Sequence, residues 1–367
     1  MKLRRLTGLL LSLVLLFCTG CSQSAAPRSA PSPTAEEQAL SSPPETPAET
    51  PSNQQAEETV SAEKNAPAPA QEASFTLCAY LPVSSMTQGA AAVAEEYAGS
   101  IAALDYLVLN TGAYWDENGA LSLSDELLDA IETLQGKTAL WCTVNPQGAL
   151  IREGTAGQSI DSPQERQALA QEIAAFAEQY GLAGIDIDWE FPLDDEWEDF
   201  STFLIALKDT LSRNSEPVAL SLALYPEEIA LSEEAIAALD RIHVMAYDQF
   251  DSEGFHSTMQ AAEDAVAYFT ALGASPQQLV LGIPAYGRPL DGSAQWVFYK
   301  DIDPESISGE NPDLVGDISF NSAATAAQKT QYALEQNLGG VMVYQLLCDR
   351  NDQDALILAC ANMAKNA

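Results

Sequence analysis

The chain has 367 residues, with 53 acidic side chains against 16 basic ones and a formal net charge of -37. A nucleic acid or an anionic lipid surface needs a basic patch to neutralise its phosphates, so neither is an expected partner. The length suffices for one large domain or two ordinary ones. We interpret the acidic surface as a source of solubility.

The first 20 residues have the pattern of an export signal. A basic start, Met1–Arg5, precedes an apolar run to Phe17 and small residues before Cys21. This apolar run is shorter than a membrane-spanning helix usually needs. We expect residues 1–20 to be a lipoprotein-type signal peptide and Cys21 to carry the lipid. The protein would then be exported and held on the outer face of the cell membrane. A spare cysteine in a discarded signal is the alternative.

Residues 21–73 differ sharply in composition, with Pro, Ala, Ser, Thr, Glu and Gln dominant. Such a segment buries too little apolar surface to offset its chain entropy. It is therefore predicted to be a disordered tether. A folded domain is predicted from Ser74 to Ala367.

Strand and helix patterns alternate along this domain. Strands are predicted at 76–81, 106–110, 138–144, 184–190, 218–224, 242–247, 279–284 and 340–345. Helices are predicted at 87–103, 124–134, 162–180, 195–211, 232–239, 259–272, 323–336 and 353–364. The helix that begins at Ser162 opens with a capping box and a proline at its first position.

Eight strands separated by helices predict an α/β fold, a closed (β/α)8 TIM barrel. The connection after the seventh strand, Arg288–Asn321, lacks a helical pattern and is expected to form a short excursion. An open doubly wound sheet is the alternative, but no glycine-rich phosphate loop follows the first strand. In barrels the reacting groups lie at the carboxyl ends of the strands.

Three carboxylates stand two residues apart on the fourth predicted strand: Asp186, Asp188 and Glu190. Residues at this spacing point to one face of a strand, and here the other face is bulky and apolar. Crowded carboxylates raise at least one pKa, which keeps an acid protonated near neutral pH. The trio therefore indicates acid–base chemistry, the alternative being a half-exposed strand with a polar outer face.

This strand resembles the signature of glycoside hydrolase family 18, the chitinase-like barrels. The pattern Asp-x-x-Asp-x-Asp-x-Glu is matched by residues 183–190 except at its first position, which is Ala183. Three more segments agree in order and spacing with the motifs of strands six, seven and eight: Met245–Asp248, Gly282–Arg288 and Gly339–Tyr344. The resemblance covers Ser74 to Asn366.

The resemblance implies a role for each matched residue. Glu190 would be the general acid and then the base. Asp188 would bind the acetamido nitrogen of the substrate, and Asp186 would control the protonation of Asp188. Tyr247 would donate to the acetamido carbonyl, with Asp248 beside it. The family uses the N-acetyl oxygen of the substrate as its nucleophile. Four more residues are expected to bind substrate: Tyr80, Tyr286, Arg288 and Tyr344. No metal or cofactor is implied.

The chain also departs from the family pattern. Ala183 replaces an aspartate, Tyr344 stands where a tryptophan usually floors the sugar site, and Gln345 follows where an acid is common. The Ser-x-Gly-Gly pattern of strand three is absent. A deep processive cleft is therefore not expected, and the sugar preference stays open.

Several residues also have purely structural interpretations. Tyr286 could be barrel packing, Arg288 a salt-bridge partner, and Trp115 and Trp141 either cleft or core. The core interpretation is favoured for Trp189 and His243, and His256 is assigned to a loop. Four cysteines in apolar segments are expected to be buried free thiols, with one disulfide still possible: Cys78, Cys142, Cys348 and Cys360.

The leading hypothesis is a monomeric, exported glycosidase that acts with retention on β-linked N-acetylated amino-sugar glycans. Peptidoglycan, chitin-type oligomers and N-glycan cores are the candidate substrates. The alternative is a chitinase-like lipoprotein that binds such sugars without cleaving them. A third hypothesis takes the acid trio as a divalent-metal site.

Overall fold

The computed structural model describes residues 75–190, 192–308 and 311–367, all of which belong to one compact unit. The predicted signal peptide, the predicted lipid attachment at Cys21 and the predicted tether lie outside the described residues.

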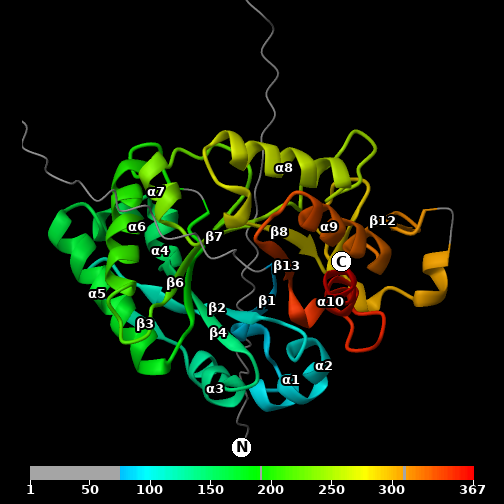
Figure 1. The fold of residues 1–367 in the computed structure, drawn as a ribbon, viewed down its shortest axis with the longest axis horizontal. Coiled ribbons are helices and arrows are strands. Elements are labelled where there is room, and N and C mark those ends of the chain that lie inside the picture. Colours follow the sequence, from blue (N-terminus) through cyan, green and yellow to red (C-terminus); the bar gives the residue numbers. More distant parts are fainter. Residues whose placement is uncertain (1–74, 191, 309–310) are drawn as a thin grey trace, which may run out of the picture. The chain divides into compact units, whose positions relative to one another are not determined.

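A closed ring of eight parallel strands forms the centre of this unit (Figure 1). The ring runs β1-β13-β8-β7-β6-β5-β4-β2 and closes by pairing of β1 with β2. Its strands are β1 Thr76–Pro82, β2 Tyr106–Trp115, β4 Ala139–Pro146, β5 Gly184–Ile187, β6 Ala219–Leu224, β7 Arg241–Val244, β8 Leu279–Pro284 and β13 Gly340–Tyr344. The predicted (β/α)8 barrel is confirmed.

Helices surround the ring of strands (Figure 1). They are α1 Ala90–Glu96, α2 Ala98–Ile101, α3 Asp125–Leu134, α4 Gly148–Glu153, α5 Pro163–Tyr180, α6 Trp197–Leu211, α7 Glu233–Ala238, α8 Met259–Ala271, α9 Ala323–Glu335 and α10 Leu356–Asn366. The capping box at Ser162 is present, with its hydroxyl accepting from Glu165 and the Glu165 carboxylate accepting in return. None of the helices in the described ranges is both long and apolar enough to cross a bilayer.

Several boundaries differ from the sequence predictions, and three of them bear on the account. The helix predicted at 87–103 is broken at the buried Tyr97, which leaves helical geometry between α1 and α2. The helix predicted from Asp195 begins at Trp197. The fourth barrel strand ends at Ile187 and not at Glu190, because the Asp188 amide donates to the side chain of Asn145 on β4, 2.7 Å away, and not to a backbone carbonyl of that strand.

The predicted excursion after the seventh barrel strand is a small antiparallel sheet of order β10-β9-β12-β11. Its strands are β9 Tyr286–Pro289, β10 Val297–Phe298, β11 Leu314–Val315 and β12 Ile318–Ser319. A further short strand, β3 Leu121–Leu123, pairs antiparallel with the end of β2. The small sheet matters for function because it carries Tyr286 and Arg288.

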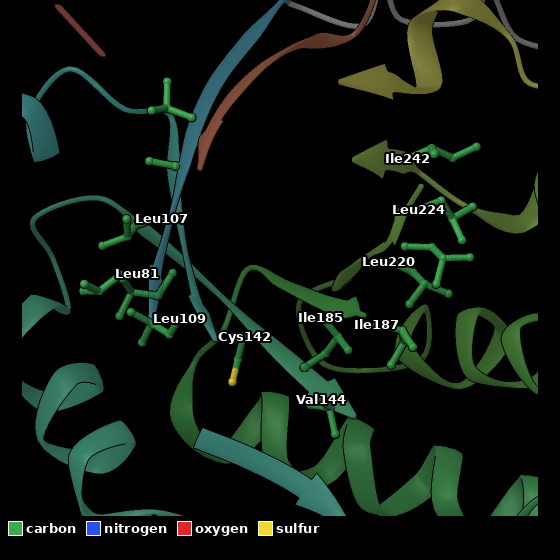
Figure 2. Close-up of a cluster of buried hydrophobic side chains, with 14 of the residues drawn as sticks. Leu81, Leu107, Leu109, Cys142, Val144, Ile185, Ile187, Leu220, Leu224 and Ile242 are labelled. Carbon is green, nitrogen blue, oxygen red and sulfur yellow. The ribbon is translucent and has the colours of Figure 1, made fainter. Parts of the chain in front are cut away.

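Alternate residues of each barrel strand face opposite ways, as strand geometry requires. One set packs between the strands and the helices, as Leu81, Leu107, Ile185 and Leu220 do in Figure 2. The other set fills the barrel interior and includes the aromatic side chains of Tyr80, Tyr106 and Trp141. Tyr247, which follows β7, and Tyr286, on β9, pack with them. The acids of the site therefore lie against this interior layer of side chains.

The structure decides most of the interpretations left open by sequence. Trp115 and Trp189 are buried in the outer core, while Trp141 lies in the barrel interior and stacks on Tyr106 with ring centroids 4.3 Å apart. The four cysteines of the domain are buried and free, as expected.

Candidate active site

Asp186 lies at the base of the site and is completely buried. Neutral hydroxyl groups from three strands donate to its carboxylate. Tyr80 and Thr143 donate to Oδ2 at 2.9 and 3.0 Å, and Ser221 donates to Oδ1 at 2.5 Å. A buried carboxylate is tolerated when its lone pairs are satisfied in this way.

Strand register places these donors. Thr143 on β4 and Ser221 on β6 are the direct Cα partners of Asp186 on β5, so the three side chains share one layer of the interior. Gly184, two residues earlier, leaves room for the indole of Trp141, since a Cβ there would lie 2.1 Å from the ring. The layer beneath the acids is thus fixed by the barrel itself.

Asp188 is half-buried just beyond the end of β5. Burial, followed by the charges of Glu190 and Asp186, raises its pKa well above the usual range of a carboxyl group. Its Oδ1 atom is buried without a hydrogen-bond partner among the described residues. That oxygen therefore has unused hydrogen-bonding capacity.

Glu190 is exposed at the mouth of the barrel. The protein atoms around it reduce its hydration and, with the negative charge of Asp248, raise the pKa of the carboxyl group. An acid with a raised pKa and access to solvent can both donate and recover a proton.

Tyrosine rings surround the two carboxyl groups. Tyr247 is buried, with its ring 5.7 Å from that of Tyr344 and 6.3 Å from that of Tyr286. Gly282 makes space for it, because a Cβ there would lie 2.8 Å from the Tyr247 ring. Burial and the nearby charges of Asp188 and Glu190 raise the pKa of Tyr247, so its hydroxyl keeps its proton and can donate it in a hydrogen bond.

Trp296 adds an aromatic side chain that the sequence analysis missed. It stacks on Tyr286 at 3.8 Å and 3°, lies edge-on to Tyr344 at 6.2 Å, and is 38% exposed. It comes from the excursion, where no strand or helix periodicity marked it. Together Trp296 and Tyr344 offer aromatic surface of the kind on which sugar rings stack.

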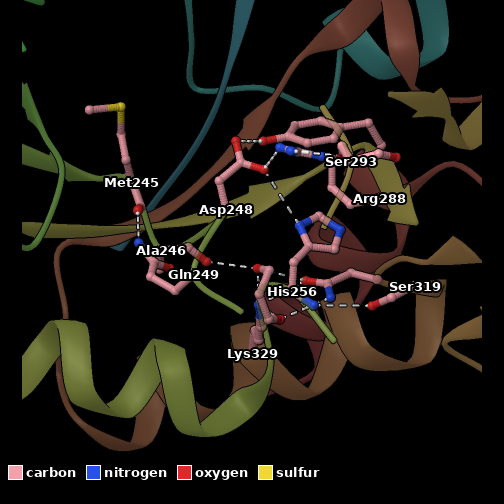
Figure 3. Close-up of polar contacts among 12 residues, drawn as sticks. Met245, Ala246, Asp248, Gln249, His256, Arg288, Ser293, Ser319 and Lys329 are labelled. Carbon is pink, nitrogen blue, oxygen red and sulfur yellow. Dashed lines mark hydrogen bonds and ion pairs between the residues drawn. The ribbon is translucent and has the colours of Figure 1, made fainter. Parts of the chain in front are cut away.

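Asp248 is held by charge as well as by hydrogen bonds (Figure 3). Tyr286 donates to its Oδ2 at 2.8 Å, and Arg288 forms an ion pair with Oδ1. Its backbone has φ of 63°, a left-handed conformation in which aspartate is commoner than most residues. Arg288 also donates to the Ser293 carbonyl at 3.2 Å and lies over the Phe250 ring.

The sequence left Tyr286 and Arg288 between structural and functional roles, and both are buried. Each holds Asp248 in place. Tyr80, expected to bind substrate, is 2% exposed and bonded to Asp186, so it supports that carboxylate from below.

A second buried polar cluster lies behind Asp248 (Figure 3). Lys329 is fully buried and donates to the Ser257 carbonyl, the Ser257 hydroxyl and the Asn321 side chain at 2.7 to 2.8 Å. The Ser257 hydroxyl in turn donates to the Ala246 carbonyl at 2.7 Å. This chain of contacts ties α9 to the segment that carries Tyr247 and Asp248.

His256 is buried between this cluster and the site, with its ring 5.6 Å from that of Tyr286. Burial, followed by the charges of Lys329 and Arg288, lowers its pKa to about 3. The imidazole is therefore neutral at physiological pH, and its 3.9 Å approach to Asp248 is not an ion pair.

A cavity of about 370 Å³ lies to one side of the acids, between α8 and the segment that follows β7. Gln249, Phe250, Asp251 and Tyr268 are among its lining residues. It adjoins Asp248 through Gln249 and does not include the acid trio. The described residues contain no group of three or more His, Cys, Asp or Glu side chains that could hold a metal ion.

The family model described as "Glycosyl hydrolases family 18" matches residues 153–349, more than half of the chain. The chain belongs to this family. The matched region includes the acid trio, Tyr247–Asp248 and the strands that carry Tyr286 and Tyr344.

One curated relative is "Probable chitinase 2" of Drosophila melanogaster, 27% identical over 181 residues. The alignment spans 44% of this chain and 37% of the insect protein, so only part of that relative is matched.

Solved structures of family 18 share the fold. The chitinase ChiB of Flavobacterium johnsoniae superposes with a TM-score of 0.68 at 22% identity, covering 80% of this chain and 94% of that one. The chitinase of Cycas revoluta, solved in complex with (GlcNAc)3, gives 0.60 at 21% identity, covering 78% and 99%. At these identities the likeness supports the barrel.

The barrel brings together the side chains that the family motifs named. Ring contacts and hydrogen bonds link Tyr80, Tyr344, Tyr247, Tyr286 and Asp248 in one continuous set. The sequence analysis did not identify the donors Thr143 and Ser221 or the acceptor Asn145, because single polar residues inside apolar strands carry no distinguishing pattern.

Proposed function

We propose that this chain is a glycosidase that hydrolyses β-linked N-acetylglucosamine glycans by a retaining, substrate-assisted mechanism. The observation that carries the proposal is the pair Asp188 and Glu190 at the mouth of a family 18 barrel, both with raised pKa values. The chitinase names of the relatives and the (GlcNAc)3 complex of the Cycas revoluta protein support the substrate class.

Glu190 is the general acid in this proposal. Its raised pKa favours the protonated form, which a donor to the glycosidic oxygen needs. After the leaving sugar departs, the ionised carboxylate removes a proton from water. One exposed carboxyl group thus serves both half-reactions.

The nucleophile would be the N-acetyl carbonyl oxygen of the substrate, so the enzyme needs to hold an amide and not to attack. The unpartnered Asp188 Oδ1 suits the amide N–H, and the protonated Tyr247 hydroxyl suits the carbonyl oxygen. Ionised Asp188 would then stabilise the positive charge that develops on the ring. Trp296 and Tyr344 provide stacking surface for the sugar.

The test incubates the full chain with N-acetylglucosamine oligomers and, separately, with purified peptidoglycan, and identifies the products by mass spectrometry. The native chain should release shorter fragments from at least one substrate, and Glu190→Gln should release none. Glu198→Gln, an exposed acid on α6, is the matched control and should keep its activity. Equal product from Glu190→Gln and the native chain would contradict the proposal.

A sugar-binding protein without activity is the second candidate, favoured by Tyr344 in place of the usual tryptophan and by Ala183 in place of the first aspartate. Intact oligomers that bind to the native chain in calorimetry would establish it in preference to the glycosidase.

We also propose that the protein is exported as a monomer and anchored by a lipid at Cys21, from the sequence pattern described above. Metabolic labelling with a radioactive fatty acid should mark the native chain and not Cys21→Ser. Label on both proteins would contradict the anchor, and a dimer in light scattering would contradict the monomer.

A further inference from the structure

His243 on β7 is a buried titratable group that the proposed mechanism does not use. Its ring lies inside the barrel with both nitrogens in hydrogen-bond contact. Nδ1 is 2.6 Å from the Tyr80 hydroxyl oxygen, and Nε2 is 2.9 Å from that of Tyr106. Nδ1 also lies 3.4 Å from Asp186 Oδ1. A buried imidazole therefore faces the carboxylate beneath the catalytic acids.

The Tyr80 hydroxyl has one proton and two partners, Asp186 and His243. If it donates to Asp186, then Nδ1 must carry a proton and donate to the Tyr80 oxygen. If it donates to Nδ1, then Asp186 must carry a proton and donate to the Tyr80 oxygen. The same positions of the Asp186, Tyr80 and His243 side chains are thus compatible with two arrangements of the protons.

The two arrangements can hold the same number of protons. In one, an imidazolium faces an Asp186 carboxylate. In the other, a neutral imidazole faces a protonated Asp186. The change breaks the Nδ1–H bond and the Tyr80 O–H bond, and forms a new Tyr80 O–H bond and an Asp186 O–H bond. The Nε2 proton stays in place and donates to Tyr106, so no outside reactant is needed.

The other groups around His243 do not supply this proton. Burial raises the pKa values of Tyr80, Tyr106 and nearby Cys78 well above their usual ranges, so these groups stay protonated. Arg241, on the same strand, donates to backbone carbonyls. The neighbouring strands β6 and β8 place Ala223 and Val280 beside His243, and β4 contributes the Trp141 ring. Imidazole is the side chain here that ordinarily gains and loses a proton near neutral pH.

We propose that His243 is a positioning residue that delivers a proton to Asp186 through Tyr80, and so controls the charge beneath Asp188 during turnover. The proposal rests on the proposed glycosidase function. Its consequence is electrostatic. The negative charge of Asp186 is one reason that Asp188 resists ionisation. A proton that reaches Asp186 removes this repulsion. The partly exposed Asp188 can then release its own proton to solvent water and ionise as positive charge builds on the sugar.

The first experiment measures kcat and KM of the full chain against pH for a soluble N-acetylglucosamine oligomer. His243→Gln can keep one hydrogen bond to each tyrosine but cannot accept a proton. Asp186 must then take its proton without help from an imidazole. The alkaline limb of the kcat profile should therefore shift to lower pH by at least one unit, while KM stays within about threefold of the native value. Tyr80→Phe, which removes the bridging hydroxyl and keeps the imidazole, should move the limb in the same direction. His256→Gln is the control and should leave the limb where it is.

The second measurement needs no turnover. The chain contains two histidines, so ¹⁵N-imidazole spectra assign His243 by comparison with His256→Gln. We expect the Nδ1 and Nε2 chemical shifts of His243 to differ between the native chain and Asp186→Asn, because Tyr80 links the two side chains. Unchanged His243 spectra in Asp186→Asn, or superimposable kcat profiles for the native chain and a folded His243→Gln, would overturn the relay. If no variant or native chain shows turnover, the glycosidase proposal fails by itself and the spectra still decide the coupling.

Discussion

Two aspartates of the site, Asp186 and Asp248, are held in contrasting ways. Asp186 is fully buried and receives neutral hydroxyl donors from three barrel strands. Asp248 has a side chain 31% exposed and is held by the Arg288 guanidinium and one phenol, both from the small sheet. The donors of Asp186 belong to the barrel and are uncharged, so a proton from a neighbouring group can still neutralise the Asp186 carboxylate. The Asp248 carboxylate is instead fixed by the opposite charge of Arg288.

The first way to test this contrast is to remove the buried carboxylate. Asp186→Ala should lower the free energy of unfolding by about 3 kcal/mol, because it leaves several buried donors without an acceptor. Urea denaturation measures this. Ser221→Ala, which removes one donor, should cost about 1 kcal/mol. A smaller loss for Asp186→Ala than for Ser221→Ala would contradict the role of Asp186 as the common acceptor.

The second test breaks the charge pair. Arg288→Leu should reduce kcat/KM about 30-fold, or about 2 kcal/mol, because Asp248 loses the partner that orients it. Arg288→Lys should recover only part of the loss, since lysine lacks the fork that reaches both Asp248 and the Ser293 carbonyl. Steady-state kinetics decide this, and full activity in Arg288→Leu would show that the pair does not position Asp248.

The third test concerns Lys329 behind Asp248. Burial lowers its pKa to about 7, so between that pH and the ordinary range of lysine the unfolded chain binds more protons than the folded one. Stability should therefore rise as pH increases above 7, by up to about 1.4 kcal/mol per pH unit from this group. Denaturation of Lys329→Met at pH 7 and 9 should lack this increment, and the exposed-site control Lys365→Met should keep it. Equal slopes in both variants would contradict a proton deficit at Lys329.

The smallest expected effect is at the aromatic surface between the two regions. Trp296→Ala should raise KM for an oligosaccharide about three- to tenfold, in keeping with about 0.5–1.5 kcal/mol for one aromatic contact. Phe298→Ala, similarly exposed on β10, should leave KM unchanged. An equal rise of KM in both variants would indicate damage to the small sheet and not the loss of a sugar contact.

The same contrast explains which parts of the fold and site could be predicted from the sequence. Alternating strand and helix patterns predicted the barrel, and the spacing of Asp186, Asp188 and Glu190 located its active end. The strand predicted at 184–190 was too long, because the Asp188 amide bonds the Asn145 side chain in place of the β4 backbone and β5 ends at Ile187. That contact joins residues 43 positions apart, which periodicity does not register.

The region around Asp248 was harder to predict because its partners come from irregular chain. Trp296 lies in the excursion, and Lys329 reaches Ser257 from a helix 72 residues away. His243 was correctly placed in the core by its position on a strand. Its contact with Tyr80 and its approach to Asp186 depend on how β1, β5 and β7 close around the interior, which only the folded barrel specifies.

The most direct test of the account is the stereochemistry of the first product. Proton NMR of the full chain acting on an N-acetylglucosamine oligomer distinguishes the two anomers before they interconvert. Attack by the N-acetyl oxygen followed by water, with Glu190 as acid and base, predicts that the β-anomer appears first. An initial α-anomer would contradict this mechanism, because it would require water to displace the leaving sugar directly.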